Sequence, residues 1–261
     1  MKALRIFLLN CKISLLNEMA HKINFLMRFL SDSIYFVIYY IFYTVIFTLV
    51  PNINGWVIYD ILLLMGTFHI IISLFAAVFI PNLAQIPMLV KSGGLDGFIV
   101  KPINSRFLLS ARFIDIGSLI NIILGVAIVI NSIIRLGLDI STATFLLYIG
   151  YILIGVFIMY NILFILICTI FWLHDSSWSI GFFMTFNSFA DKPISIYKGM
   201  IYRFLIYLFP IALVANIPAS VMLKNFDSNL QIWFVIAALL LFYFSNIIWR
   251  KGITLYEGAS I

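Results

Sequence analysis

Charged residues are scarce in this chain. Of its 261 residues, 10% are Asp, Glu, Lys or Arg, whereas 64% are hydrophobic and the mean hydropathy is +1.15. An ordinary soluble domain carries about a quarter charged residues, so this composition excludes a soluble globular fold of this size. The chain also contains many apolar runs of 18 or more residues, which favour membrane-spanning helices over barrel strands. The sequence therefore predicts an all-α, polytopic integral membrane protein.

Cysteines and catalytic motifs are also scarce. Cys11 and Cys168 are too few and too far apart for a disulfide framework or a C-x-x-C metal site. The three histidines lie on separate segments without metal-ligand spacing, and no H-E-x-x-H motif occurs. A G-x-x-x-x-G-K-[ST] phosphate loop is missing as well. We therefore expect no catalytic, cofactor-binding or metal-binding residues, and no enzyme activity of the chain's own.

Long apolar runs are what the sequence does contain. Each of six runs is long enough to cross a hydrocarbon core of about 30 Å. They cover residues 33–50, 57–80, 107–134, 143–172, 200–222 and 230–249. Pro210 and Pro218 lie within the fifth run, which predicts a kinked or partly re-entrant helix there.

The basic residues are segregated between the connecting segments. Fourteen of the sixteen Lys and Arg residues precede the first run, follow the sixth, or lie in the connectors after the second and fourth runs and in the first residues that follow these connectors. Arg135 and Lys224 are the two exceptions. Because translocation disfavours basic loops, six spans with both termini in the cytoplasm are predicted for a multi-pass protein of the cytoplasmic membrane. The basic clusters read as topology signals, so the net charge of +6 does not indicate a nucleic-acid partner.

Two segments outside these runs are predicted to lie along the inner membrane face. In residues 1–31 polar and apolar side chains recur every three or four positions, which is typical of an amphipathic helix on the lipid interface. Residues 174–198 are moderately apolar but contain Asp175 and Asp191, and are interpreted as a second interfacial helix ended by Pro193. The alternative for this segment is a short seventh span, which would place the C-terminus outside.

The connector after the second run, residues 82–106, is the long polar interruption of the apolar pattern. Pro87 and Pro102 bracket it and Gly93-Gly94 divides it, which predicts a bent connector of two short pieces. It carries charges at Lys91, Asp96, Lys101 and Arg106. We expect it to lie along the cytoplasmic membrane surface as a docking site for a partner; the alternative is a solvated loop.

A few polar residues fall inside the apolar runs. His69 and Asn121 lie in the second and third runs and, with Pro210 in the fifth, are candidates for a substrate path. Hydrogen bonding between helices is the alternative for both polar side chains. Arg112 and Asp115 are expected to form an ion pair near the inner end of the third run. Since carboxylates deep in the membrane are almost absent, transport must be passive or driven from elsewhere.

Three stretches resemble the ABC-2 family of transporter permeases. Gly93 to Ile103 resembles that family's G-x-L-D signature with a following basic residue and proline. Phe189 to Tyr197 is similar to its stretch before the fifth span, and Trp249 to Ser260 to its closing segment. The resemblance covers nearly the whole chain in order and implies that residues 1–261 form a single ABC-2 type transmembrane domain.

The resemblance implies the membrane subunit of an ABC exporter that moves an amphipathic or hydrophobic substrate, such as a lipid, peptide or drug. ATP and Mg would be bound by a separate ATPase subunit, and a second permease, identical or different, would complete the path. The expected ATPase-coupling residues are Gly93, Gly94, Asp96, Lys101 and Pro102. A secondary transporter or channel not powered by ATP, and a membrane-embedded lipid-modifying enzyme, remain as alternatives.

Overall fold

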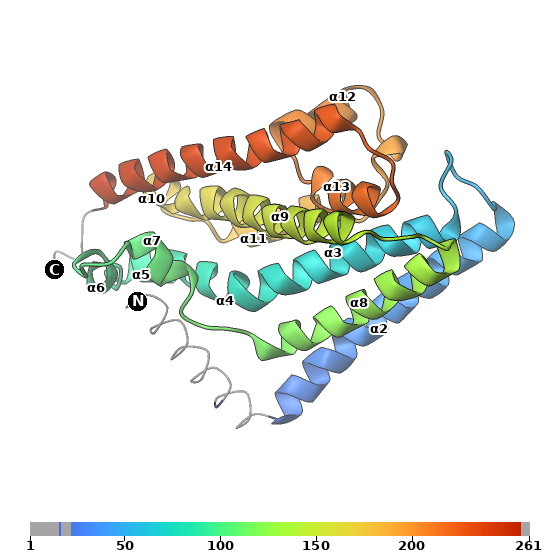
Figure 1. Ribbon diagram of the computed structural model, residues 1–261. Coiled ribbons are helices and arrows are strands. Elements are labelled where there is room, and N and C mark those ends of the chain that lie inside the picture. Colours follow the sequence, from blue (N-terminus) through green and yellow to red (C-terminus); the bar gives the residue numbers. More distant parts are fainter. Residues whose placement is uncertain (1–15, 17–21, 257–261) are drawn as a thin grey trace.

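The computed structural model describes residue 16 and residues 22–256, and every regular element in that part of the chain is a helix. The long helices run roughly along one axis of the bundle (Figure 1). They are α2 (Lys22–Leu49), α3 (Ile58–Val78), α8 (Ile116–Leu136), α9 (Thr142–Cys168) and α14 (Ser228–Leu255). The all-α prediction is confirmed.

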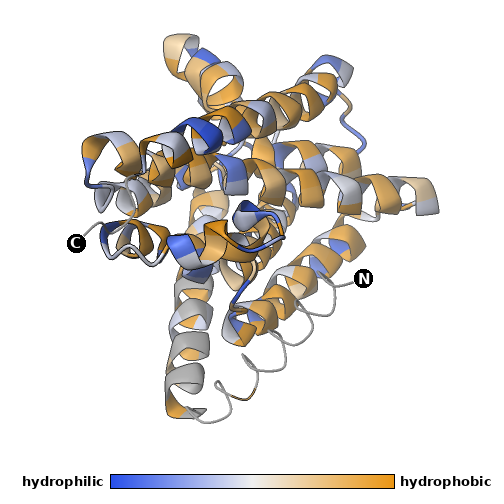
Figure 2. Cartoon of the chain, turned by 90° about the vertical axis from the view of Figure 1, so that its left-hand side faces the viewer, coloured by the Kyte–Doolittle hydropathy of each residue, from blue (hydrophilic) through white to orange (hydrophobic). Residues whose placement is uncertain are grey.

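Hydrophobic residues are spread over the outer helices as well as the interior (Figure 2). Ile123 on α8 and Leu239 on α14, for example, expose about two thirds of their surface, at 66% and 63%. A soluble monomer rarely exposes apolar surface on this scale, whereas lipid tails cover it without cost. The bundle is therefore built to sit in a bilayer.

Four helical stretches in the described residues are long and apolar enough to cross a membrane. They are Ile58–Val78, Ile116–Leu136, Thr142–Leu173 and Ser228–Leu255. A bent pair, Gly199–Leu208 with Leu213–Met222, makes a fifth if it counts as one span. Six spans were predicted, and the structure supports four or five by this measure. In α2 the apolar part, Val37–Leu49, is shorter than a full span.

Glycines bring the central helices α3 and α8 into close contact. A Cβ placed on Gly125 would lie 2.9 Å from the carbonyl oxygen of Gly66, and one on Gly66 would lie 3.0 Å from the carbonyl oxygen of Gly125. Helices in lipid associate through such packing, because apolar surface gains little there from leaving the solvent. This pair positions the residues that α3 and α8 contribute to the site described below.

The connector between α3 and α8 is a chain of four short helices at one end of the bundle (Figure 1). They are α4 (Ile80–Leu83), α5 (Ile86–Lys91), α6 (Asp96–Ile99) and α7 (Ser105–Ser110). Gly93 lies between α5 and α6 with φ +73°, a left-handed conformation that suits glycine. The connector is therefore broken at the predicted glycines but has more pieces than expected.

The predicted third span, residues 107–134, is wrong as a single helix. Its first residues belong to α7, and α8 starts at Ile116. At the break, Asn82 Oδ1 accepts hydrogen bonds from the main-chain N–H groups of Arg112 at 3.1 Å and Phe113 at 2.9 Å. Asp115 caps the first turn of α8 through Ser118 N–H at 3.3 Å. Side chains thus replace the bonds that a continuous helix would make.

The fifth apolar run is sharply broken. It consists of α12 (Gly199–Arg203), the π-helix η2 (Phe204–Leu208) and α13 (Leu213–Met222), with an angle of 88° across the break. Trp233, near the start of α14, donates from Nε1 to the carbonyl of Ile206 at 2.8 Å. α13 leads back to the start of α14. The helices on both sides of the break therefore lie at the end of the bundle opposite the connector (Figure 1).

Residues 174–198, which were predicted to form an interfacial helix, pack against the helical bundle. After α10 (Ile170–Leu173), the helix α11 (Trp178–Asn187) turns back along α9, with Ser179 Oγ donating to the carbonyl of Leu166 at 3.0 Å. Phe183 is fully buried and its ring lies 5.3 Å from that of Phe75. The 3-10 helix η1 (Ile194–Ile196) then leads to α12 at the far end. Burial of these apolar side chains holds α11 against the bundle.

Only part of the predicted interfacial helix over residues 1–31 can be compared. Residues 22–31 form the beginning of α2, which continues without interruption into the first apolar run. The remainder, apart from residue 16, lies outside the described residues.

Candidate functional site

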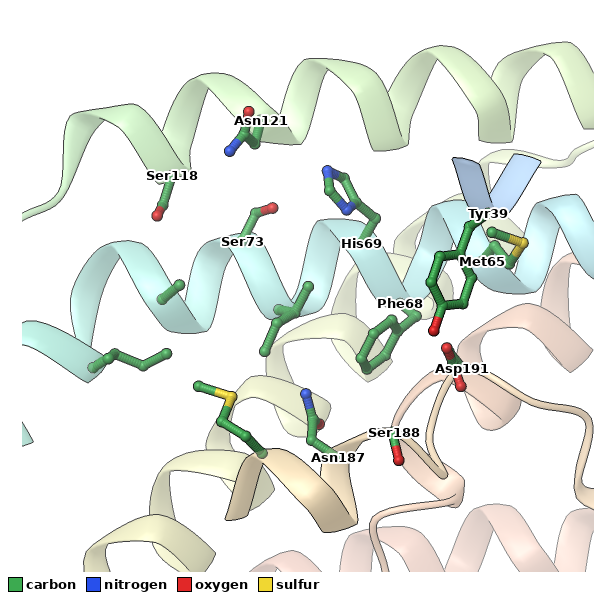
Figure 3. A pocket seen from close by; sticks show the side chains of 14 residues that line it. Tyr39, Met65, Phe68, His69, Ser73, Ser118, Asn121, Asn187, Ser188 and Asp191 are labelled. Carbon is green, nitrogen blue, oxygen red and sulfur yellow. The ribbon is translucent and has the colours of Figure 1, made fainter. Parts of the chain in front are cut away.

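A cavity of about 410 Å³ lies among α2, α3, α8 and the segment that begins with α11 (Figure 3). Its walls combine an apolar surface with several polar side chains. The lining residues are Tyr39, Met65, Phe68, His69, Ile72, Ser73, Ala76, Ile80, Ser118, Asn121, Met184, Asn187, Ser188 and Asp191. A concave, mostly apolar site with a few converging polar groups is the usual form of a small-molecule site.

One polar wall is made by α3 and α8. His69 and Ser73 lie one helical turn apart on α3 and therefore share a face, and Ser118 and Asn121 do the same on α8. His69 also contacts the main chain of Asn121. The structure thus brings two of the three predicted path residues together, and His69 takes part in the interhelical contact that was its alternative role.

Pro210, the third predicted path residue, is not part of this wall. It is buried at the sharp break between η2 and α13 and does not line the cavity. Its position accounts for the interrupted helix, since proline lacks the N–H that would continue the main-chain bonds.

The facing polar wall was not foreseen from the sequence. It comes from Asn187, Ser188 and Asp191, in the segment that was assigned to the membrane surface. Asn187 is 5% exposed and, within the described part of the chain, its Oδ1 has no hydrogen-bond partner. Lys192 Nζ contacts Asp191 Oδ1 at 2.7 Å and donates to the carbonyl of Ser188 at 2.6 Å. The sequence signal that could have revealed this wall is the spacing of Asn187 and Asp191, which corresponds to one helical turn.

The five predicted coupling residues lie together in the short helices at the connector end. Asp96, at the start of α6, and Lys101 and Pro102, which follow it, are exposed. The ammonium of Lys101 lies 5.2 Å from the centre of the Phe98 ring. Gly93 and Gly94 form the turn before α6. These residues therefore present one exposed surface of the connector.

Two contacts hold this surface against the rest of the bundle. Lys91 on α5 pairs with Asp175 at 3.3 Å, and both side chains are more than half exposed. Hydrogen bonds from Ser177 and from Lys91 lower the pKa of Asp175. Tyr256, just after α14, lies near Asp96: burial and that carboxylate raise the pKa of its phenol. The end of α14 and the loop after α10 thus brace the connector.

Arg106 is the main departure from the predicted surface charges. It was counted as an exposed cytoplasmic cation, but its side chain is buried with 6% exposure. Nε donates to Tyr160 Oη at 2.8 Å, and Nη2 to Asn161 Oδ1 at 2.7 Å, both on α9. Nη1 donates to Asn246 Oδ1 on α14 at 2.7 Å. One guanidinium therefore joins the connector helix α7 to two long helices.

Aromatic rings complete the surroundings of this guanidinium. Its central carbon lies 4.3 Å from the ring centre of Phe164, 5.0 Å from Tyr160 and 5.4 Å from Phe242. Ring faces attract a desolvated cation, and the guanidinium, being more weakly hydrated than an ammonium, is well suited to this site. The sequence signal for a buried polar site was the presence of two polar residues, Asn161 and Asn246, on otherwise apolar helices.

The ion pair predicted between Arg112 and Asp115 is wrong. Arg112 instead donates through Nη2 to Gln85 Oε1 and lies 4.9 Å from the ring centre of Phe98. Asp115 is occupied as the cap of α8, with Ser118 Oγ donating to Oδ2 at 3.0 Å. The contact made by Arg112 ties the start of α8 to α6 and to the residue before α5.

The described residues contain no group of three or more His, Cys, Asp or Glu side chains arranged to hold a metal ion. The arrangement that they do contain, apolar helices around a polar cavity with a braced connector at one end, defines a multi-pass helical membrane protein with the features of a transporter. Residues 33–260 match a family described as ABC-2 family transporter protein. The chain belongs to that family and is a membrane transport component. Neither a curated protein sequence nor a solved structure matches the chain.

Proposed function

We propose that this chain is the permease subunit of an ATP-driven exporter in the cytoplasmic membrane, powered by a separate ATPase subunit. The observation that carries the proposal is the Arg106 network. The guanidinium links the connector to α9 and α14 through three hydrogen bonds, so a displacement of the connector is transmitted to both helices.

The topology that we propose has six crossings with both termini in the cytoplasm. α2, α3, α8, α9, the segment containing α11, and α14 make the crossings, and the pair formed by α12 and α13 re-enters from the outside. The support is the charge distribution: the four basic residues between Lys91 and Arg112 and the Arg250-Lys251 pair lie on the connector side. In this proposed topology Lys198 and Arg203 lie on the outside, which differs from the segregation predicted from the sequence.

The exposed connector is proposed as the ATPase contact. Asp96 and Lys101 make polar contacts to the ATPase, while Gly93, Gly94 and Pro102 set the shape of the turn that carries them. Exposure of Asp96 and Lys101, and the positive φ of Gly93, support these roles. ATP and Mg are bound by the ATPase and not by this chain.

The cavity containing His69 and Asn121 is proposed as part of the substrate path. Its mixed lining suits an amphipathic molecule. A second permease, either a copy of this chain or a different one, completes the path, and membrane lipids surround the pair.

Purification of the full chain from native membranes tests this function. We expect an ATPase subunit to co-purify, and Asp96→Lys to reduce its recovery and its substrate-stimulated ATP hydrolysis. Asp139→Lys is the matched control, because Asp139 is exposed in the loop between α8 and α9, at the other end of the bundle. Transport by the purified chain alone, without ATP, would instead identify a channel or secondary transporter.

A further inference from the structure

We propose that the cavity among α2, α3, α8 and α11 selects organic cations: amphipathic molecules with an ammonium head and an apolar tail. The inference deepens the function proposed above and rests on it. Asp191 is the acidic residue of the lining, which contains no Lys or Arg. Its basic partner, Lys192, lies outside the lining, so the charge that faces the cavity is negative, which favours a cation and opposes an anion.

The head of such a ligand finds hydrogen-bond acceptors and rings at one end of the cavity. In Figure 3, Tyr39 and Phe68 gather around Asp191, and Asn187 points into the cavity from the same wall. Asn187 Oδ1 is an acceptor without a donor in the described part of the chain. An ammonium can donate to Asp191 and rest against the aromatic rings, which compensates for its lost water. Asn187 Oδ1 is itself buried, so it becomes a second acceptor for the ammonium when the side-chain amide turns toward the cavity.

The tail finds an apolar surface along α3 and the first residue of α4. Met65, Ile72, Ala76 and Ile80 line the cavity from that side, and Met184 lines it from α11. From Met65 to Ile80 the lining follows the chain for about 22 Å at the helical rise. These apolar residues, which lie beside the polar His69 and Ser73, therefore provide a surface as long as an extended alkyl chain.

Lys192 acts as a built-in competitor for the head. Its Nζ contacts Asp191 Oδ1 at 2.7 Å, although Lys192 itself does not line the cavity. A ligand cation must share or displace this ammonium. Removing the lysine therefore strengthens ligand binding, whereas removing the aspartate weakens it. Opposite effects from two adjacent residues are the signature of the proposed site.

The test uses the full chain in lipid nanodiscs and a diazirine-bearing alkylammonium as a photoaffinity probe. Labelling of the peptide that contains α11 is quantified by mass spectrometry. The competitors are octylammonium, octanol and octanoate, which share a tail and differ in the charge of the head. Asp139→Asn is the control for loss of one exposed carboxylate.

We expect octylammonium to compete better than octanol, and octanoate to compete least. Asp191→Asn should weaken the octylammonium competition about tenfold, the value of a strong charge-assisted contact, and Lys192→Met should strengthen it. In the double variant Asp191→Asn/Lys192→Met, octylammonium and octanol should compete with the probe equally well. Asn187→Leu should weaken octylammonium without changing the charge of the site.

The proposal is overturned if octanol competes as well as octylammonium in the wild-type chain, or if Asp191→Asn and Lys192→Met shift the competition in the same direction. Should Asp191→Asn fail to fold, the other two variants test the proposal. It is then overturned if Lys192→Met does not strengthen the competition by octylammonium and Asn187→Leu does not weaken it. Either negative result removes only the substrate class. The permease function itself fails separately, if no ATPase subunit co-purifies.

Discussion

Arg106 and Asn161, 55 residues apart in the chain, are joined by a hydrogen bond of 2.7 Å from Nη2 to Oδ1. The same Asn161 oxygen accepts a hydrogen bond from Ser245 Oγ on α14, also at 2.7 Å. A single side-chain amide thus connects α7, α9 and α14. Because the guanidinium is buried and its neighbours are neutral, each of these contacts helps to compensate for its lost hydration.

Arg106→Lys should destabilise the chain by about 2 kcal/mol, because lysine cannot reproduce the three-way guanidinium geometry and leaves buried oxygens without donors. Unfolding can be followed by the reaction of Cys168, which is fully buried, with a thiol-reactive dye in a Cys11→Ser background. Arg250→Lys is the matched control, since Arg250 is exposed. Equal stability of the two variants would show that the network contributes nothing.

Gly125→Ala should separate α3 from α8 and cost about 1–3 kcal/mol, the usual penalty of overpacking. The added methyl group would lie 2.9 Å from the carbonyl oxygen of Gly66 and 2.8 Å from the Ile70 side chain. Gly150→Ala on α9 is the control, because nothing lies within 4 Å of that Cβ. The same dye assay compares them. A Gly125 variant as stable as the Gly150 variant would contradict the close helix contact.

Lys198→Cys should react with a membrane-impermeant maleimide added to intact cells, because residues 174–198 run across the bundle. Gly97→Cys on α6 should react only after the membrane is opened. Both substitutions are made in a chain whose two native cysteines are replaced by serine. If Lys198→Cys also requires opened membranes, the proposed path of this segment is incorrect and the predicted surface helix is restored.

Gly93→Ala should impair coupling to the ATPase more than it impairs folding. At φ +73° a Cβ costs about 1–2 kcal/mol, which the short turn can relieve by changing its shape. We expect normal membrane insertion with reduced substrate-stimulated ATP hydrolysis in the assembled transporter. Gly97→Ala has open space around its Cβ and should behave as wild type. Equal activity of the two variants would remove Gly93 from the coupling role.

The spans that the sequence predicted well are those whose apolar runs are uninterrupted. The expected run 57–80 corresponds to α3 (Ile58–Val78), and the run 230–249 lies within α14 (Ser228–Leu255). In lipid the main chain must satisfy its own hydrogen bonds, so a long apolar run has little choice but a helix. The bend near Pro210 was predictable for the converse reason.

The cavity was only half predictable. His69 and Asn121 stand out as polar groups in apolar runs, but Asn187 and Asp191 lie in a segment whose mixed composition also fits a membrane surface. Arg106 was misread for a related reason: basic residues near span ends are usually topology signals. Nothing in its local sequence indicates that Tyr160, Asn161 and Asn246 surround it.

The amino-acid sequence alone determined that this protein is a helical membrane protein, where most of its long helices lie, and that its connector bends at Gly93. Tertiary structure alone decided that residues 174–198 pack along α9, that Arg106 is buried, and that two polar walls face one cavity. The physical reason is that hydropathy and turn chemistry are local properties, whereas the partner of a buried polar group is chosen by contacts between helices distant in the chain.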